Sequence, residues 1–137
     1  MGESAKHSYL VNSIYEYVIT KVPDDEGVLV LVDLPTSKDK PPRNRDGYCP
    51  DVEYYHHGLL IIGDAKTSAD LESQHSRMQI DSYILECHEF EGNSLLVLGV
   101  PFADSMRACS VISSAQRRLN TQVPYTVINE AGVFAER

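Results

Sequence analysis

Tryptophan is absent from this 137-residue chain, and cysteine occurs only three times. Cys49, Cys87 and Cys109 are odd in number, and no two of them are spaced C-x-x-C. Neither a disulfide framework nor a cysteine-based zinc site is therefore indicated. Free thiols in a reducing compartment are the simplest interpretation, and we expect a cytoplasmic protein.

Long apolar runs are missing as well. The longest run, around 59–62, has the length of a buried strand and is far too short for a membrane span. The first residues, from Met1 to Lys6, contain no apolar centre of the kind found in signal peptides. We therefore expect no membrane association, and the length fits a single domain over residues 1–137.

Positive charge is scarce, because 12 Lys and Arg residues face 20 Asp and Glu residues and the net charge is −8. Nucleic-acid binding normally requires a basic surface. A site that gathers carboxylates around a divalent cation is nevertheless acidic, and the cation supplies positive charge locally. Basic residues also cluster at Lys38, Lys40, Arg43 and Arg45, and again at 117–118. We expect weak unaided affinity for nucleic acid, which a homodimer or a DNA-binding partner subunit would supplement.

Hydrophobic periodicity predicts an alternation of helices and strands. Helices are expected over 7–21, over 71–90 with Met78 among its apolar residues, and over 103–119 with Met106 facing inward. Strands are expected over 28–34, over 48–67 as a hairpin turning at 56–58, over 94–100, and finally over 123–128. This order predicts an α/β fold with a mixed central sheet flanked by helices. The segment 59–100 should form a right-handed parallel crossover.

Acidic and basic side chains are placed at one end of the predicted hairpin. Asp51 follows Pro50 at the start of the first strand, and Asp64 and Lys66 stand near the end of the second. Side chains two residues apart on a strand share a face, and pairing around the turn brings Asp51 opposite Asp64. Two carboxylates and an ammonium group at one sheet end can bind a hard divalent cation and contact a phosphate.

The same residues also have ordinary structural explanations. Asp51 after a proline is typical of a turn, and Asp64 with Lys66 could form a strand-end salt bridge. Glu53 shares the face of Asp51 and is a reserve ligand. The adjacent histidines at 56–57 face opposite ways on a strand, which makes them a poor shared metal site.

The arrangement Pro50-Asp51 followed by Asp64-Ala65-Lys66 resembles the signature of the PD-(D/E)XK nuclease superfamily. Its restriction-endonuclease-like core, one helix, three strands, one helix and one strand, matches the predicted order over residues 8–100. Thr67, Gln79 and Tyr83 are similar to the pattern of the RecB-like branch, and Gln79 and Tyr83 would share a helix face. That branch also tends to carry an acid in the first helix, where Glu16 is the candidate.

This resemblance implies a deoxyribonuclease that hydrolyses phosphodiester bonds with Mg²⁺ or Mn²⁺. It assigns metal binding to Asp51, Asp64, the backbone carbonyl of Ala65, and Glu16. It assigns water orientation and phosphate stabilisation to Lys66, and contacts to the substrate or support of the site to Gln79 and Tyr83. Two alternatives stay open: a nuclease-fold subunit that binds nucleic acid or a partner protein without cutting alone, and an unassigned α/β domain.

Overall fold

A computed structural model describes residues 4–23, 29–56 and 58–137 of the chain. The N-terminal half contains α1 (Ser4–Ile19), β1 (Leu31–Val32), β2 (Val52–His56), β3 (Leu59–Ala65), α2 (Ser68–Glu72) and α3 (Gln74–Glu89). The rest contains β4 (Asn93–Gly99), the 3₁₀ helix η1 (Phe102–Asp104), α4 (Ser105–Leu119), β5 (Tyr125–Asn129) and β6 (Gly132–Glu136). None of the helices in these described ranges is long and apolar enough to cross a membrane.

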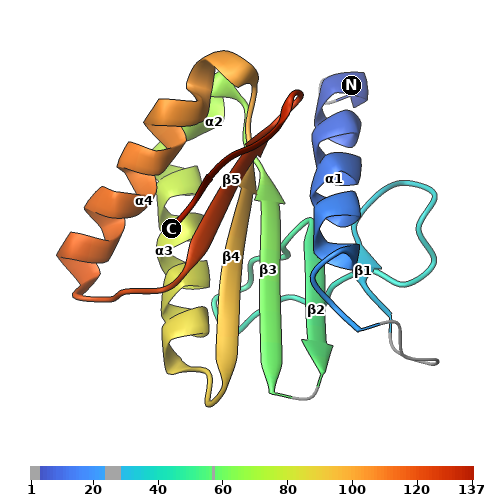
Figure 1. Cartoon of the computed structure of the whole chain (residues 1–137), viewed down its shortest axis with the longest axis horizontal. Helices are drawn as coiled ribbons and strands as arrows, with labels where there is room; N and C mark the ends of the chain where they lie inside the picture. Colours follow the sequence, from blue (N-terminus) through green and yellow to red (C-terminus); the bar gives the residue numbers. More distant parts are fainter. Residues whose placement is uncertain (1–3, 24–28, 57) are drawn as a thin grey trace.

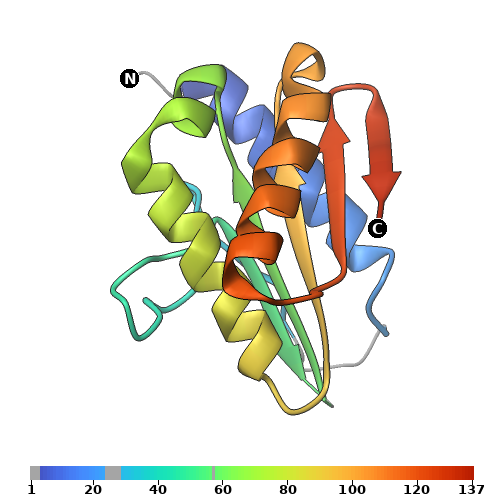
Figure 2. The same cartoon turned by 90° about the vertical axis from the view of Figure 1, so that its left-hand side faces the viewer.

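The strands form one mixed six-stranded sheet in the order β1-β2-β3-β4-β5-β6. The pairs β1–β2, β2–β3 and β5–β6 are antiparallel, whereas β3–β4 and β4–β5 are parallel. Helix α1 covers one face of the sheet, and α3 and α4 lie side by side on the other (Figures 1 and 2). The predicted α/β fold, with a mixed sheet flanked by helices and a parallel β3–β4 pair, is confirmed.

Helix α1 packs on the sheet through one apolar stripe. Leu10, Ile14 and Val18 are buried against sheet residues that include Val97. Their spacing of three to four residues places them on one helix face. A Cβ atom built at Gly63 would lie 2.5 Å from Cγ2 of Ile14, so the missing side chain allows the helix to approach the strand.

Gly63→Ala is therefore expected to destabilise the protein by about 1–3 kcal/mol, because the added methyl overpacks the interface. Urea unfolding would measure the loss. The double variant Gly63→Ala/Ile14→Ala should be more stable than the sum of the two single effects, since removing the Ile14 branches makes room for the methyl. If the two losses of stability simply add, the contact between the new methyl and Ile14 does not cause the destabilisation by Gly63→Ala.

Several predicted elements differ from the structure. The helix expected over 71–90 is two helices that meet at Ser73, whose side chain accepts a hydrogen bond from the Ser76 N–H and begins α3. The strand expected over 28–34 pairs only at Leu31–Val32, and Val28 lies outside the described residues. Met106, expected to face inward, is 72% exposed, and Met78, one of the apolar residues of the expected 71–90 helix, is 52% exposed. The last strand extends to Asn129, and the tail after it forms β6.

Candidate active site

Asp51, Asp64 and Lys66 meet at one end of the sheet. Val52 of β2 pairs with Gly63 of β3, so the preceding Asp51 lies opposite Asp64, as the sequence predicts. The N-terminus of α1, the end of β3 and the short helix α2 lie at this same end of the molecule (Figure 1). The hairpin therefore delivers groups 13 residues apart in the chain to one place.

Reciprocal backbone hydrogen bonds hold the two carboxylates. The N–H of Asp51 donates to Oδ1 of Asp64 over 3.1 Å. The N–H of Ala65 donates to Oδ2 of Asp51 over 2.8 Å. In a strand, the N–H and C=O of one residue point towards the same neighbouring strand. The Ala65 carbonyl is therefore directed to the side where Asp51 lies.

Lys66 reaches into the acidic pair from the end of β3. Its Nζ lies 2.7 Å from Oδ2 of Asp64 and donates to Oε1 of Gln79 over 2.5 Å. The side chains of Lys66 and Asp64 are only 6% and 5% exposed. Gln79 of α3 thus fixes the ammonium group, and the predicted proximity of Asp64, Lys66 and Gln79 is observed.

Burial, followed by the charge of the nearby Asp51 carboxylate, raises the pKa of the Asp64 carboxyl to about 8, against the opposing effect of Lys66. Desolvation and a like charge both disfavour the ionised form of an acid. A cation that bound next to Asp51 and Asp64 would therefore stabilise their ionised forms.

Tyr83 lies behind the acidic pair in α3. It is completely buried, and its hydroxyl has no hydrogen-bond partner within the described part of the chain. Burial raises its pKa above the ordinary range, and the Asp64 and Asp51 carboxylates add to the effect. A neutral phenol at this point can donate a hydrogen bond towards the site, but it does not line the cleft in front of it.

Asp51, Asp64 and Lys66 line a cleft of about 380 Å³. The cleft is also lined by Cys49, Thr67, His75 and His7. Thr67 stops β3, because its hydroxyl and the Asp70 carboxylate form a capping box that starts α2. Burial and the Asp33 carboxylate raise the pKa of the Cys49 thiol, which keeps it in the neutral form.

His7 is a cleft residue beside the acidic pair that the sequence analysis did not identify. Its Nε2 lies 3.5 Å from Oδ1 of Asp51, and its side chain is 26% exposed. His7 stands three residues before Leu10 and seven before Ile14, so it continues the sheet-facing stripe of α1 to the cleft. That spacing was the signal that could have found it.

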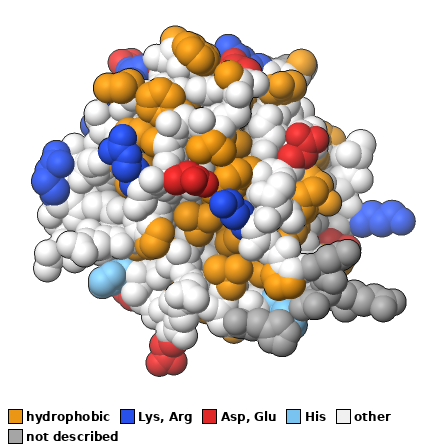
Figure 3. All heavy atoms as spheres, viewed as in Figure 1, with side chains coloured by type: hydrophobic (Ala, Val, Ile, Leu, Met, Phe, Trp, Pro, Cys, Tyr) orange, Lys and Arg blue, Asp and Glu red, His pale blue; other side chains and the backbone are white. Residues whose placement is uncertain are grey.

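Glu16, the acid predicted from the same helix, lies elsewhere. It is exposed and lines a separate pocket with Tyr9, Asn129 and Val133, between α1 and the β5–β6 turn. On this side of the molecule apolar side chains reach the surface (Figure 3). The structure therefore does not bring Glu16 together with Asp51 and Asp64.

Glu53, the reserve ligand, is not among the residues that line the cleft. Burial, followed by the charge of Glu86, raises the pKa of Glu53 to about 7.

Comparisons with protein-family models, curated proteins and solved structures gave no match for this chain. The chemical interpretation therefore rests on the site itself.

The donor set at the cleft fits a hard divalent cation in part. Two carboxylates and an imidazole line the cleft together with Ala65, and each carboxylate oxygen can accept more than one bond. Within the described ranges, no three His, Cys, Asp or Glu side chains form a complete metal-binding group. Water and the Ala65 carbonyl would have to complete an octahedral shell, as is usual for Mg²⁺.

Proposed function

We propose that this chain is a divalent-metal-dependent deoxyribonuclease with a restriction-endonuclease-like fold, of the PD-(D/E)XK type. The observation that carries the proposal is the convergence of Asp51, Asp64 and Lys66 on one cleft, with Nζ of Lys66 2.7 Å from Asp64. A buried cation beside two carboxylates is a costly arrangement for a merely structural role, because desolvation opposes it. Asp51, Asp64 and Lys66 all line a cleft, which favours a functional role.

The proposed ligands of Mg²⁺ or Mn²⁺ are Asp51, Asp64 and the Ala65 carbonyl, and His7 is added on geometric grounds. When bound, the cation neutralises charge on the scissile phosphate and makes the attacking water more acidic. Glu16 is left out of this set because it lies at a different pocket.

The residues of the chain would divide the remaining work. Lys66, oriented by Gln79, is placed to bind a non-bridging phosphate oxygen and to hold the attacking water. To do so, its ammonium group exchanges part of its contact with Asp64 for the substrate. Gln79 keeps the ammonium directed into the cleft, and Tyr83 closes the site from behind and excludes bulk water.

Thermal unfolding offers a test of metal binding that needs no substrate. Millimolar Mn²⁺ is expected to raise the melting temperature of the wild type by several degrees, since a ligand present at 100 times its Kd stabilises by about 2.7 kcal/mol. Asp51→Asn should lose this shift. Glu16→Gln, which removes the same charge from the other pocket, should keep it. An equal loss in both variants would contradict the assigned ligands.

Cleavage of plasmid DNA with a panel of Mg²⁺, Mn²⁺ and Ca²⁺ tests the activity itself. The proposal expects nicking or linearisation with Mg²⁺ or Mn²⁺ and none with EDTA. Absence of cleavage across single-stranded, nicked, duplex and branched DNA would count against it.

The alternative is a nuclease-fold subunit that binds nucleic acid or a partner protein in a larger complex without cutting alone. The net charge of −8 favours it, because an isolated acidic domain attracts DNA poorly. Mass spectrometry of complexes isolated from the native host would detect such a partner, whereas brisk cleavage by the purified chain would rule this alternative out.

A further inference from the structure

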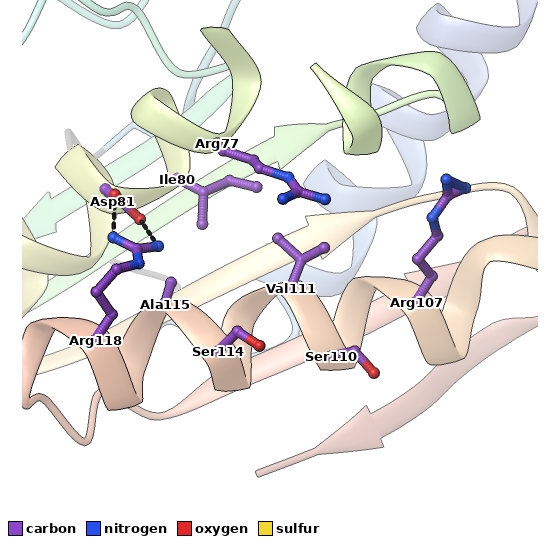
Figure 4. A pocket seen from close by; sticks show the side chains of 9 residues that line it. All are labelled: Arg77, Ile80, Asp81, Arg107, Ser110, Val111, Ser114, Ala115 and Arg118. Atoms are coloured by element: carbon purple, nitrogen blue, oxygen red, sulfur yellow. Dashed lines mark hydrogen bonds and ion pairs between the residues drawn. The ribbon is translucent and has the colours of Figure 1, made fainter. Parts of the chain in front are cut away.

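A second concave site lies between α3 and α4, outside the cleft. It has a volume of about 230 Å³ and a floor that includes Ile80 and Ala115, which are 0% and 2% exposed. Three arginines line it, Arg77 from α3 and Arg107 and Arg118 from α4 (Figure 4). We refer to it as the arginine groove. Three of the 12 basic residues of an acidic chain are thus gathered around one small depression.

The three arginines differ in how far their charge is already neutralised. Arg118 donates two hydrogen bonds to the Asp81 carboxylate, over 2.8 and 3.1 Å. Arg107 is paired with both Glu72 and Asp104. Each of these guanidinium groups therefore has an internal counter-ion.

Arg77 is the exception. Its Nε donates to the backbone carbonyl of Leu71 over 3.3 Å, and within the described residues no carboxylate forms an ion pair with it. Its guanidinium extends over the groove towards Val111 (Figure 4). The Leu71 carbonyl of α2 thus accepts a hydrogen bond from Nε, and the Arg77 side chain is exposed. A guanidinium edge with parallel N–H donors matches the oxygens of a phosphate group.

The arginine groove and the cleft flank the same part of α3. His75, Ser76 and Gln79 line the cleft, and Arg77 and Ile80 line the groove. The two sites are therefore separated by about the width of one helix, roughly 10–12 Å. One strand of B-form DNA carries a phosphate about every 3.4 Å along the axis, and its backbone also winds around that axis, so phosphates only a few nucleotides apart can reach both sites.

We propose that the arginine groove binds a backbone phosphate of nucleic acid through Arg77, a few nucleotides from the phosphate held at the cleft. That a nucleic acid is the occupant rests on the proposed function. The contact supplies cationic binding where the chain as a whole is acidic, and it would fix the direction in which the strand crosses α3.

DNA binding in EDTA tests the groove without any cleavage. Fluorescence anisotropy would follow a labelled 12-nucleotide strand and its duplex over a series of salt concentrations. Arg77→Ala should weaken binding roughly fivefold and reduce the slope of log K against log salt by about one. Arg117→Ala is the matched control, because Arg117 is exposed on α4 and does not line the groove. It should change binding by less than twofold.

A variant with the opposite expected sign sharpens the test. Asp81→Asn removes the counter-ion of Arg118 at the rim of the groove and should strengthen DNA binding about twofold. Arg77→Lys keeps the positive charge but loses the paired N–H donors of the guanidinium. Its affinity for DNA should therefore lie between those of wild type and Arg77→Ala. Circular dichroism melts of all variants would establish that they are folded under the binding conditions.

Three results would overturn the proposal. One is equal weakening by Arg77→Ala and Arg117→Ala, which would mean general surface attraction. Another is unchanged DNA binding in Arg77→Ala. The third is inorganic phosphate shifting the Arg77 side-chain resonance in NMR spectra while DNA leaves it unmoved, which would assign the groove to a free anion. The nuclease proposal fails separately, when DNA binds in an Arg77-dependent way but no metal supports cleavage.

Discussion

Lys66→Met is expected to reduce metal-dependent DNA cleavage by roughly 10³-fold, the order found when a positioned electrostatic or acid–base group is removed. The reason is specific to this site. The Lys66 ammonium lies 2.7 Å from the Asp64 carboxylate, and Gln79 accepts a hydrogen bond from it over 2.5 Å. Methionine preserves the length of the side chain and its apolar stem. Cleavage rates under single-turnover conditions would measure the loss.

Two controls separate catalysis from folding. Lys21→Met removes a lysine whose side chain is 44% exposed and pairs with Glu136, and it should cleave at the wild-type rate. Circular dichroism of Lys66→Met at the assay pH should give a wild-type spectrum with metal present. The variant should be less stable at pH 8 in EDTA, because Asp64 and Asp51 lose the nearest positive charge. A fully active Lys66→Met protein would remove the basis for the proposed mechanism.

The convergence of the hairpin ends could be predicted from the sequence, for a simple geometric reason. A strand has a period of two, so Asp64 and Lys66 had to share a face. The tight turn fixed the register, so Asp51 had to lie opposite Asp64. Both inferences needed only local periodicity and one turn. Gln79 was identified by the resemblance to the RecB-like branch, and periodicity alone would not have selected it.

Other features depended on information that local periodicity does not contain. The first-helix residue at the cleft depends on how α1 is positioned over Gly63, and that packing selects His7 at the end of the stripe rather than Glu16. A helical period also predicts Met106 to be inward, but it stands in the first turn of α4, where its side chain is 72% exposed. The arginine groove exists only because α3 and α4 pack side by side.

Asp64→Asn is expected to stabilise the protein at pH 8 in EDTA by about 1–2 kcal/mol, while it abolishes cleavage. The sign follows from linkage. Folding raises the pKa of Asp64 to about 8, whereas an aspartate in the unfolded chain has a pKa of about 3.9. Between these values the unfolded state releases the proton more readily, so the stability of the wild type falls as pH rises through this range. Asparagine has no proton to lose and removes this contribution.

Urea unfolding at several pH values between 4 and 8, with EDTA throughout, would measure the difference between the two proteins. The stability curves of wild type and Asp64→Asn should nearly meet at the acidic end of this range and diverge towards the alkaline end. Mn²⁺ should then close the gap, because it binds and stabilises only the wild type. A variant that is less stable than wild type at pH 8 in EDTA would mean that the Asp64–Lys66 ion pair, at 2.7 Å, outweighs the cost of burying the carboxylate. The acidic pair would then be a structural element, and its position beside the cleft would no longer argue for a metal.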